Sequence, residues 1–145
     1  MSEYGFGEID PHALSRIETT FRNLDSLVTD TEYDSPLNPT ELRVFLGAGF
    51  DSEEGRFDVR WGETGMYAFH YTEFSGLDFR FDRHPNPHSS EKHFHPPPEA
   101  SRDQAERSCI EVESSELVAR AVHRCFRTAL DHSDLTQLNL LTDPP

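Results

Sequence analysis

The stretch "RFDVRWGETGMYAFHYTEFSGLDFRFDRH", residues 56–84, alternates apolar and polar side chains in consecutive runs. The apolar positions are Phe57, Val59 and Trp61, then Tyr67, Phe69 and Tyr71, and finally Leu77, Phe79 and Phe81. A period of two places successive side chains on opposite faces of a strand, so each run predicts a β-strand with one buried face. The separators "GETG" and "EFSG" are short and contain glycine, which favours antiparallel hairpins over helical crossovers.

Two amphipathic helices are predicted at the ends of the chain. Residues 11–28 have apolar side chains at spacings of three and four, preceded by Asp10 as N-cap and by a proline at the first helical position. Ser114 is the predicted N-cap of a second helix, whose apolar stripe extends from Leu117 to Leu130. Each helix therefore has one face to bury.

The remaining segments complete an α+β layer fold. Residues 42–46 predict a fourth strand, residues 32–39 have turn composition, and residues 108–112 predict a short fifth strand. We expect a mainly antiparallel sheet of four to five strands, with the N-terminal and C-terminal helices packed on one face. The expected organisation is a single domain over residues 1–145, with frayed tails at 1–9 and 141–145.

The charge composition is unusual in two respects. The chain carries 27 acidic residues against 13 basic ones, a formal charge of −14, and Lys92 is its single lysine. The acidic residues are spread along the whole chain and are not gathered in a tail. Strongly hydrated carboxylates suit a surface that must stay soluble in multimolar salt, where repulsion between like charges is screened. The composition therefore predicts a cytoplasmic protein of a halophile.

This interpretation predicts that the folded state depends on salt. At low ionic strength the acidic surface repels itself, whereas molar salt shortens the range of that repulsion to about 3 Å. We expect the midpoint of thermal unfolding to rise steeply between a low-salt buffer and molar KCl. A midpoint that stays constant over this range would contradict the halophile interpretation.

The composition also argues against several partners. The sequence has no apolar run of membrane length and no helix-turn-helix pattern, so neither a membrane nor DNA is an expected partner. RNA is still allowed, because a local cluster of arginines can mark a site on an acidic protein. Cys109 and Cys125 form no recognised pattern, and we expect them to be reduced, buried thiols.

The polar members of the predicted strands would share the face that the helices leave uncovered, which we call the open face. They are Glu41, Arg43, Phe45, Asp58, Arg60, Ala68, His70, Thr72, Asp78, Arg80, Asp82 and His84. One interpretation is a solvated surface with cross-strand pairs of arginine and aspartate. The other is an anion-binding surface whose arginines hold phosphates.

Histidines are concentrated where the last of these strands ends. His84, His88, His93 and His95 lie among several prolines. Histidine exchanges protons near neutral pH, and arginine stabilises a phosphoryl intermediate, so this composition suits RNA cleavage without a metal or another cofactor. The candidate catalytic residues are Arg60, His70, Arg80, Asp82, His84, His93 and His95. The alternative is an exposed loop without chemistry, and His123 and His132 are expected to pack or cap a helix.

A metal site is a competing interpretation of the same segment. His93 and His95, followed by Glu99, have the His-x-His-x3-Glu spacing of cupin metal motifs, and their donor atoms suit a first-row transition metal. Three prolines directly after His95 argue against the strand that such a motif occupies, and a jelly roll needs more strands.

The hairpin "GMYAFHYTEFSGLDFRFDRHPNPH", residues 65–88, followed by "EKHFHPPP", residues 91–98, resembles the TumE family of toxins. Arg80, Phe81 and Asp82 match the Arg-aromatic-Asp part of the family pattern, and His93 and His95 match its His-x-His part. The sequence departs from the pattern at Arg83, where a small amide is expected, and in the length of the loop between the two parts.

This resemblance implies a small type II toxin that acts on RNA and is neutralised by a cognate antitoxin. A non-enzymatic function remains open, as a binding module, as the antitoxin of such a pair, or as a His-x-His metal-binding protein. The adjacent gene discriminates between these classes, because a small DNA-binding protein encoded there supports the toxin.

Overall fold

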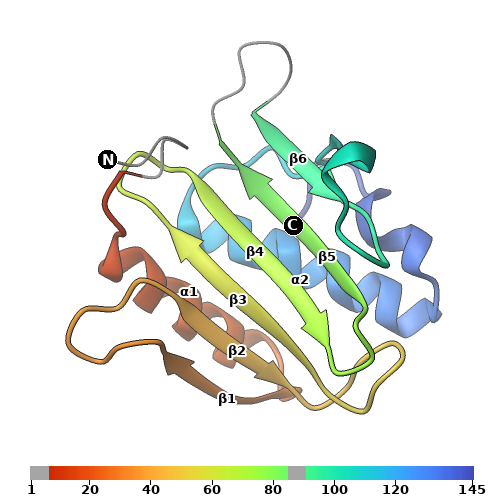
Figure 1. The fold of residues 1–145 in the computed structure, drawn as a ribbon, viewed down its shortest axis with the longest axis horizontal. Helices are drawn as coiled ribbons and strands as arrows, with labels where there is room; N and C mark the ends of the chain where they lie inside the picture. The colour runs from red at the N-terminus through yellow and green to blue at the C-terminus, as the bar shows by residue number, and fades with distance from the viewer. Residues whose placement is uncertain (1–6, 85–90) are drawn as a thin grey trace.

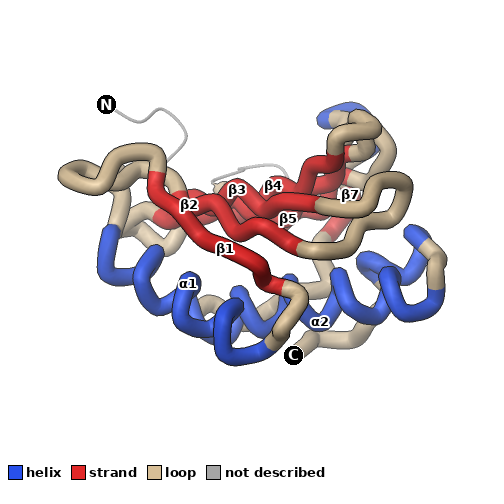
Figure 2. The backbone as a smooth tube through the Cα atoms, turned by 90° about the horizontal axis from the view of Figure 1, so that it is seen from below, coloured by secondary structure: helices blue, strands red, loops and turns tan. Residues whose placement is uncertain are grey.

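The computed structural model of the chain describes residues 7–84 and 91–145. In chain order the elements are α1 (Pro11–Leu24), β1 (Val28–Tyr33), β2 (Leu42–Leu46), β3 (Gly55–Trp61), β4 (Tyr67–Glu73), β5 (Asp78–Arg83), β6 (Lys92–His95), β7 (Glu106–Arg107) and α2 (Ser115–His132), with short 3-10 helices at Arg102–Gln104 and Leu135–Asn139. The strands form one antiparallel meander in the order β1-β2-β3-β4-β5-β6-β7 (Figure 1). Both long helices cover the same face of this sheet (Figure 2).

The predicted α+β class and the four central strands are confirmed. The strand count is wrong, since the sheet has seven strands and not four to five. The strands β2 to β5 were predictable because they alternate buried and less buried positions, as their apolar residues required. The strands that the sequence did not predict lie at the two edges of the sheet.

The first missed strand, β1, begins at the last residue of the predicted first helix and ends within the predicted turn at residues 32–39. The helix α1 ends at Leu24, because Asp25 adopts an extended backbone and its carboxylate accepts a hydrogen bond from the Leu27 amide at 2.9 Å. Val28 continues the apolar spacing of the helix, yet it is the first residue of β1. This edge strand has the polar sequence "VTDTEY", which lacks the alternation that a half-buried strand shows.

The strands β6 and β7 lie in segments whose composition did not predict strands. The strand β6 ends at His95, so the prolines that follow terminate the strand and do not interrupt it. His93 and His95 are therefore on a strand and not in an exposed loop, whereas His88 lies outside the described residues.

The predicted strand at residues 108–112 is wrong, because other groups take its backbone hydrogen bonds. The Cys109 amide donates to the Asn139 side chain at 2.7 Å, and the Ile110 amide donates to Ser108 Oγ at 3.1 Å. Lys92 Nζ donates to the Glu111 carbonyl at 2.6 Å. The strand ladder on this side of β6 ends at β7, just before this segment, and beyond it the Ser108 amide donates to the Lys92 carbonyl at 3.1 Å.

The core between the sheet and the helices is largely aromatic. Phe79 is fully buried, stacks on Tyr71 with ring centroids 4.7 Å apart, and meets Phe57 edge-on at 6.0 Å. Phe126 of α2 packs edge-on against Phe57 at 5.7 Å, so the helix and the sheet share one aromatic cluster. Burial of such side chains is the main favourable contribution to folding.

The sulfur atoms of the two cysteines lie close together at the edge of this core. Cys125 is buried and Cys109 is partly buried, and their sulfur atoms are 3.7 Å apart. In the part of the chain that is described, no helix has the length and apolar character needed to cross a membrane.

A buried carboxylate holds the loop between β2 and β3. Glu73 is 5% exposed, and it accepts hydrogen bonds from the backbone amides of Phe50, of Asp51 at 2.8 Å and of Ser52 at 3.0 Å. The Tyr71 hydroxyl donates to it at 2.6 Å. A single side chain thus replaces the backbone pairing that this long loop lacks.

We predict that Glu73→Gln destabilises the fold. The amide NH₂ of glutamine would face backbone donors, so at least one charge-assisted hydrogen bond is lost, at a cost of about 1.5–3 kcal/mol. Urea denaturation at constant salt measures this difference in the free energy of unfolding. Glu53→Gln, in the same loop, is the control, and an equal effect of both substitutions would contradict the proposed role of Glu73.

Candidate functional site

The register of the sheet sets the open-face side chains in rows that cross the strands. One row consists of Glu32, Arg43, Asp58, His70, Arg80 and His95. The neighbouring row consists of Arg60, Ala68, Asp82, His93 and Arg107. The candidate residues of the sequence therefore lie on one face, as alternation requires, but they are spread over four strands.

Arginines on β2 and β3 are paired with carboxylates of the same surface. Arg43 Nε and Arg60 Nε lie 3.2 and 3.5 Å from the two carboxylate oxygens of Glu41. Arg56 Nε lies 2.8 Å from Asp58 Oδ1. This half of the open face fits the solvated surface of paired charges, and Arg60 belongs to it.

His70 is also engaged outside the cluster described next. Its Nε2 atom lies 3.1 Å from Asp78 Oδ1 on β5, with more than a third of the histidine side chain exposed. His70 is opposite Arg80 in the register, yet its charged partner Asp78 lies in a third row, opposite Thr72. The structure thus separates Arg60 and His70 from the remaining candidates.

Arg80, Asp82 and His95 form a connected group on β5 and β6. Asp82 Oδ2 accepts a hydrogen bond from Arg80 Nε at 2.9 Å and lies 2.9 Å from His95 Nε2. Arg80 Nη2 lies 3.2 Å from the same histidine nitrogen. Asp82 and His95 are 5% and 3% exposed, whereas about 30% of the Arg80 side chain reaches solvent. The two buried residues therefore hold a guanidinium that is accessible from outside.

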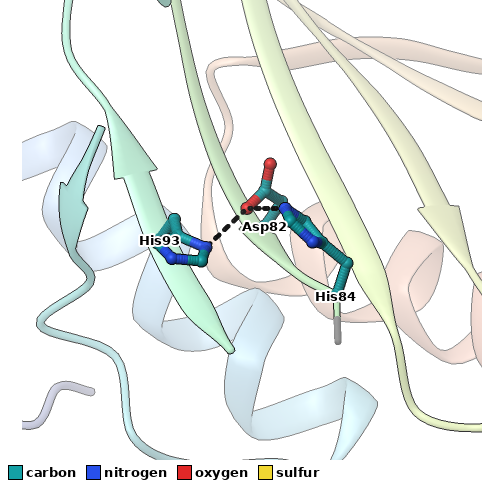
Figure 3. A group of neighbouring side chains, drawn as sticks. All are labelled: Asp82, His84 and His93. Atoms are coloured by element: carbon teal, nitrogen blue, oxygen red, sulfur yellow. Dashed lines mark ion pairs between the residues drawn. The ribbon is translucent and has the colours of Figure 1, made fainter. Parts of the chain in front are cut away.

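The second oxygen of Asp82 faces two more histidines. Asp82 Oδ1 lies 3.8 Å from His84 Nε2 and 3.9 Å from His93 Nδ1, and the three side chains point toward one another (Figure 3). This oxygen is buried and accepts no hydrogen bond from any residue that the structure describes. The imidazole rings of His84 and His93 have centroids 5.3 Å apart.

These contacts shift the ionisation of two of the groups. Burial alone raises the pKa of Asp82, but the hydrogen bond with His95 and the charges of His95, Arg80 and His84 outweigh it, so the pKa lies below its ordinary value. Burial lowers the pKa of His93, and the nearby His84 and His95 lower it further, against the opposing effect of Asp82. Asp82 is therefore held as a carboxylate, and His93 is favoured as a neutral imidazole.

A loop closes over His95. The segment after β6 turns back across the sheet, and His95 Nδ1 lies 3.4 Å from the Ser101 carbonyl oxygen. A backbone acceptor of this kind has no signature in the sequence, so the role of Ser101 could not be predicted. Arg107, which stands opposite His93 on β7, was also missed, because a strand of two residues shows no alternation.

The ligand atoms that converge are not those of the cupin-like pattern. His95 Nε2 is engaged by Asp82 and Arg80, and Glu99 lies beside Asp78 in an isolated parallel bridge. Within residues 7–84 and 91–145, the group whose donor atoms could hold a metal ion is Asp82, His84 and His93, with all three atoms within 4.8 Å of one another. The position of Asp82 explains the difference, because it lies on β5, two residues before His84, and opposite His93 on the neighbouring strand β6.

A known protein family matches the part of the chain that contains the sheet and the connected group on β5 and β6. The model of the family described as Toxin TumE matches residues 17–129, which extend from within α1 to near the end of α2. The chain belongs to this toxin family. It is therefore the toxin of a toxin–antitoxin pair, and an antitoxin is its partner. No curated protein and no solved structure matches the chain.

Proposed function

We propose that this toxin is a metal-independent ribonuclease whose site is formed by Arg80, Asp82, His84, His93 and His95. The observation that supports it is the shared carboxylate of Asp82, which binds Arg80 and His95 with one oxygen and faces His84 and His93 with the other. A partly exposed guanidinium beside two imidazoles is the minimum set for cleavage of a phosphodiester by acid–base catalysis.

In this reaction the 2′-hydroxyl oxygen of the RNA attacks the adjacent phosphorus, and the bond from phosphorus to the 5′-oxygen breaks. One imidazole of the pair His84 and His93 accepts the proton of the 2′-hydroxyl, and the other donates a proton to the leaving 5′-oxygen. Arg80 stabilises the negative charge that develops on the phosphoryl oxygens. The products are a 2′,3′-cyclic phosphate and a 5′-hydroxyl, so atoms and protons balance without a metal.

His95 and Asp82 act through Arg80 in this proposal. Both are almost fully buried, so neither meets a phosphate directly. His95 contacts Arg80 Nη2 while Asp82 binds Arg80 Nε, which fixes the plane of the guanidinium before the substrate arrives. They are positioning residues, and Arg60 and His70 lie outside the group.

The local positive charge of Arg80 is compatible with RNA as the substrate, although the net charge of the chain is negative. Arg80 shares its one carboxylate partner among the described residues, Asp82, with His95, whereas Arg56 contacts both oxygens of Asp58. At molar ionic strength the repulsion between distant carboxylates and a phosphate backbone is screened within about 3 Å. Under these conditions the local charge around Arg80, and not the net charge of the chain, determines whether a phosphate can bind.

The test is expression of the toxin with and without the adjacent gene, followed by analysis of RNA ends. Growth arrest that the adjacent gene relieves, with new 5′-hydroxyl and 2′,3′-cyclic phosphate ends, is the expected result. Purified toxin should generate the same ends in excess chelator. Arrest with intact RNA would contradict the ribonuclease and favour an inhibitor that acts by binding.

A further inference from the structure

The unpartnered oxygen of Asp82 is the feature that the proposed reaction leaves unexplained. The Asp82 side chain is 6% exposed, and its Oδ1 atom is buried without a hydrogen bond from the described residues. Buried carboxylate oxygens are normally hydrogen-bonded or bound to a cation, because an unpaired one is costly. The ring nitrogens His84 Nε2 and His93 Nδ1 lie 3.8 and 3.9 Å from Asp82 Oδ1.

These three donor atoms have the identity and spacing of a metal site. One carboxylate and two imidazoles are common ligands of Zn²⁺ and of other divalent first-row metals. A tetrahedral zinc ion with bonds of 2.0–2.2 Å separates its ligand atoms by roughly 3.3–3.6 Å. The carboxylate-to-histidine separations are 3.8 and 3.9 Å, so small rotations of the side chains would complete the site. About a third of the His84 side chain is exposed.

The neighbours of Asp82 supply the support that ligands of a metal require. Arg80 Nε and His95 Nε2 both lie 2.9 Å from Oδ2, which orients the carboxylate so that Oδ1 is directed at the two histidines. Outer contacts of this kind fix the ligand orientation in metal sites. His93 and Asp82 come from adjacent strands in register, so their backbone positions are also fixed.

We propose that Asp82, His84 and His93 bind one divalent transition-metal ion, with Zn²⁺ as its chemical type, and that the bound ion inhibits RNA cleavage. The binding is independent of the proposed function, whereas the inhibition rests on it. Coordination takes up the one basic lone pair of each neutral imidazole, at His84 Nε2 and at His93 Nδ1, and the same lone pair is the one with which an imidazole accepts a proton. An ion and a transferable proton cannot occupy the same nitrogen, so binding and catalysis exclude each other.

The binding is tested with purified toxin, freed of metal by chelator and titrated with ZnCl₂ in an isothermal calorimeter. We expect one ion per chain. His84→Ala removes a ligand at a half-exposed position, so the fold should persist and the affinity should fall by more than the 10- to 100-fold typical for loss of an outer contact. His12→Ala, which removes an exposed histidine of α1, should bind like the original chain. Circular dichroism verifies that all three proteins are folded.

The outcomes separate the two proposals. Absence of binding, or equal binding by His84→Ala and the original chain, would refute the metal site and leave the ribonuclease proposal untouched. Binding of one ion with loss of RNA cleavage supports the inference. Binding with a gain of cleavage would refute inhibition, and it would also refute the metal-independent reaction. If metal-free toxin never cleaves RNA while zinc still binds at His84, the proposed function fails and the metal site stands.

Discussion

If the toxin is the proposed ribonuclease, Arg80→Ala is expected to lower RNA cleavage by about 10²- to 10³-fold and to relieve growth arrest, because it removes the group to which we assign stabilisation of the transition state. The same substitution leaves Asp82 buried with His95 as its one strong partner. We therefore expect a loss of about 1–3 kcal/mol in the free energy of unfolding. Cleavage must accordingly be compared at equal concentrations of folded protein, verified by circular dichroism.

Two further variants distinguish catalysis from stability. Arg80→Lys retains a positive charge beside Asp82 but lacks the planar fork, so it should recover stability more than cleavage. Arg43→Ala removes an arginine from the same row of the sheet, where the side chain contacts Glu32 and Glu41 and lies far from the histidines. It should cleave RNA like the original chain. If Arg80→Ala retains full cleavage when folded, the site assignment is wrong.

The fold was predictable where a strand has two chemically different faces. In β3, β4 and β5 the apolar members meet the helices and the polar members meet the open face, so alternation alone identified them. The edge strands have no such contrast. The four residues between Val28 and Tyr33 in β1 are all polar, and the two residues of β7 are both exposed. Their formation depends on hydrogen bonds to β2 and β6, which a pattern of single residues does not encode.

The site was predictable only as a set of residues on one face. Alternation placed Arg60, His70 and Arg80 together, but it says nothing about which carboxylate each one meets. That choice depends on register and side-chain reach, since Arg60 turns to Glu41 while Arg80 turns to Asp82. The burial of His95 was equally hidden, because it results from β6 and from the loop that brings the Ser101 carbonyl over the ring.

The composition and the site impose opposite demands on the same surface. An excess of carboxylates keeps the chain hydrated, yet a site for RNA requires a cation that no carboxylate neutralises completely. The structure reconciles them locally, because Asp82 divides its charge among an arginine and three histidines, whereas Arg56 contacts both oxygens of Asp58. Burial of Asp82 below the open face also moves its charge away from an approaching phosphate.

Phe79→Ala is expected to lower the free energy of unfolding by about 3–5 kcal/mol, because it leaves a cavity in the aromatic core. Phe79 is fully buried, stacks on Tyr71 at 4.7 Å, and lies within 6.2 Å of the Phe94 ring on β6. It precedes Arg80 in the sequence but faces the helices, so the two substitutions probe opposite faces of one strand.

We expect Phe79→Ala to lose activity only to the extent that the protein unfolds. At low temperature and high salt, where the variant is folded, each folded molecule of Phe79→Ala should cleave RNA at nearly the original rate, in contrast to Arg80→Ala. Phe74→Ala is the matched control, because Phe74 is fully exposed beside the β4–β5 turn and should unfold like the original chain. Urea denaturation gives the stabilities, and RNA cleavage per folded molecule gives the comparison. The contrary outcome is a folded Phe79→Ala that cleaves RNA as poorly as Arg80→Ala. The loss of cleavage would then result from altered packing of β5, and the assignment of Arg80 to transition-state stabilisation would fail.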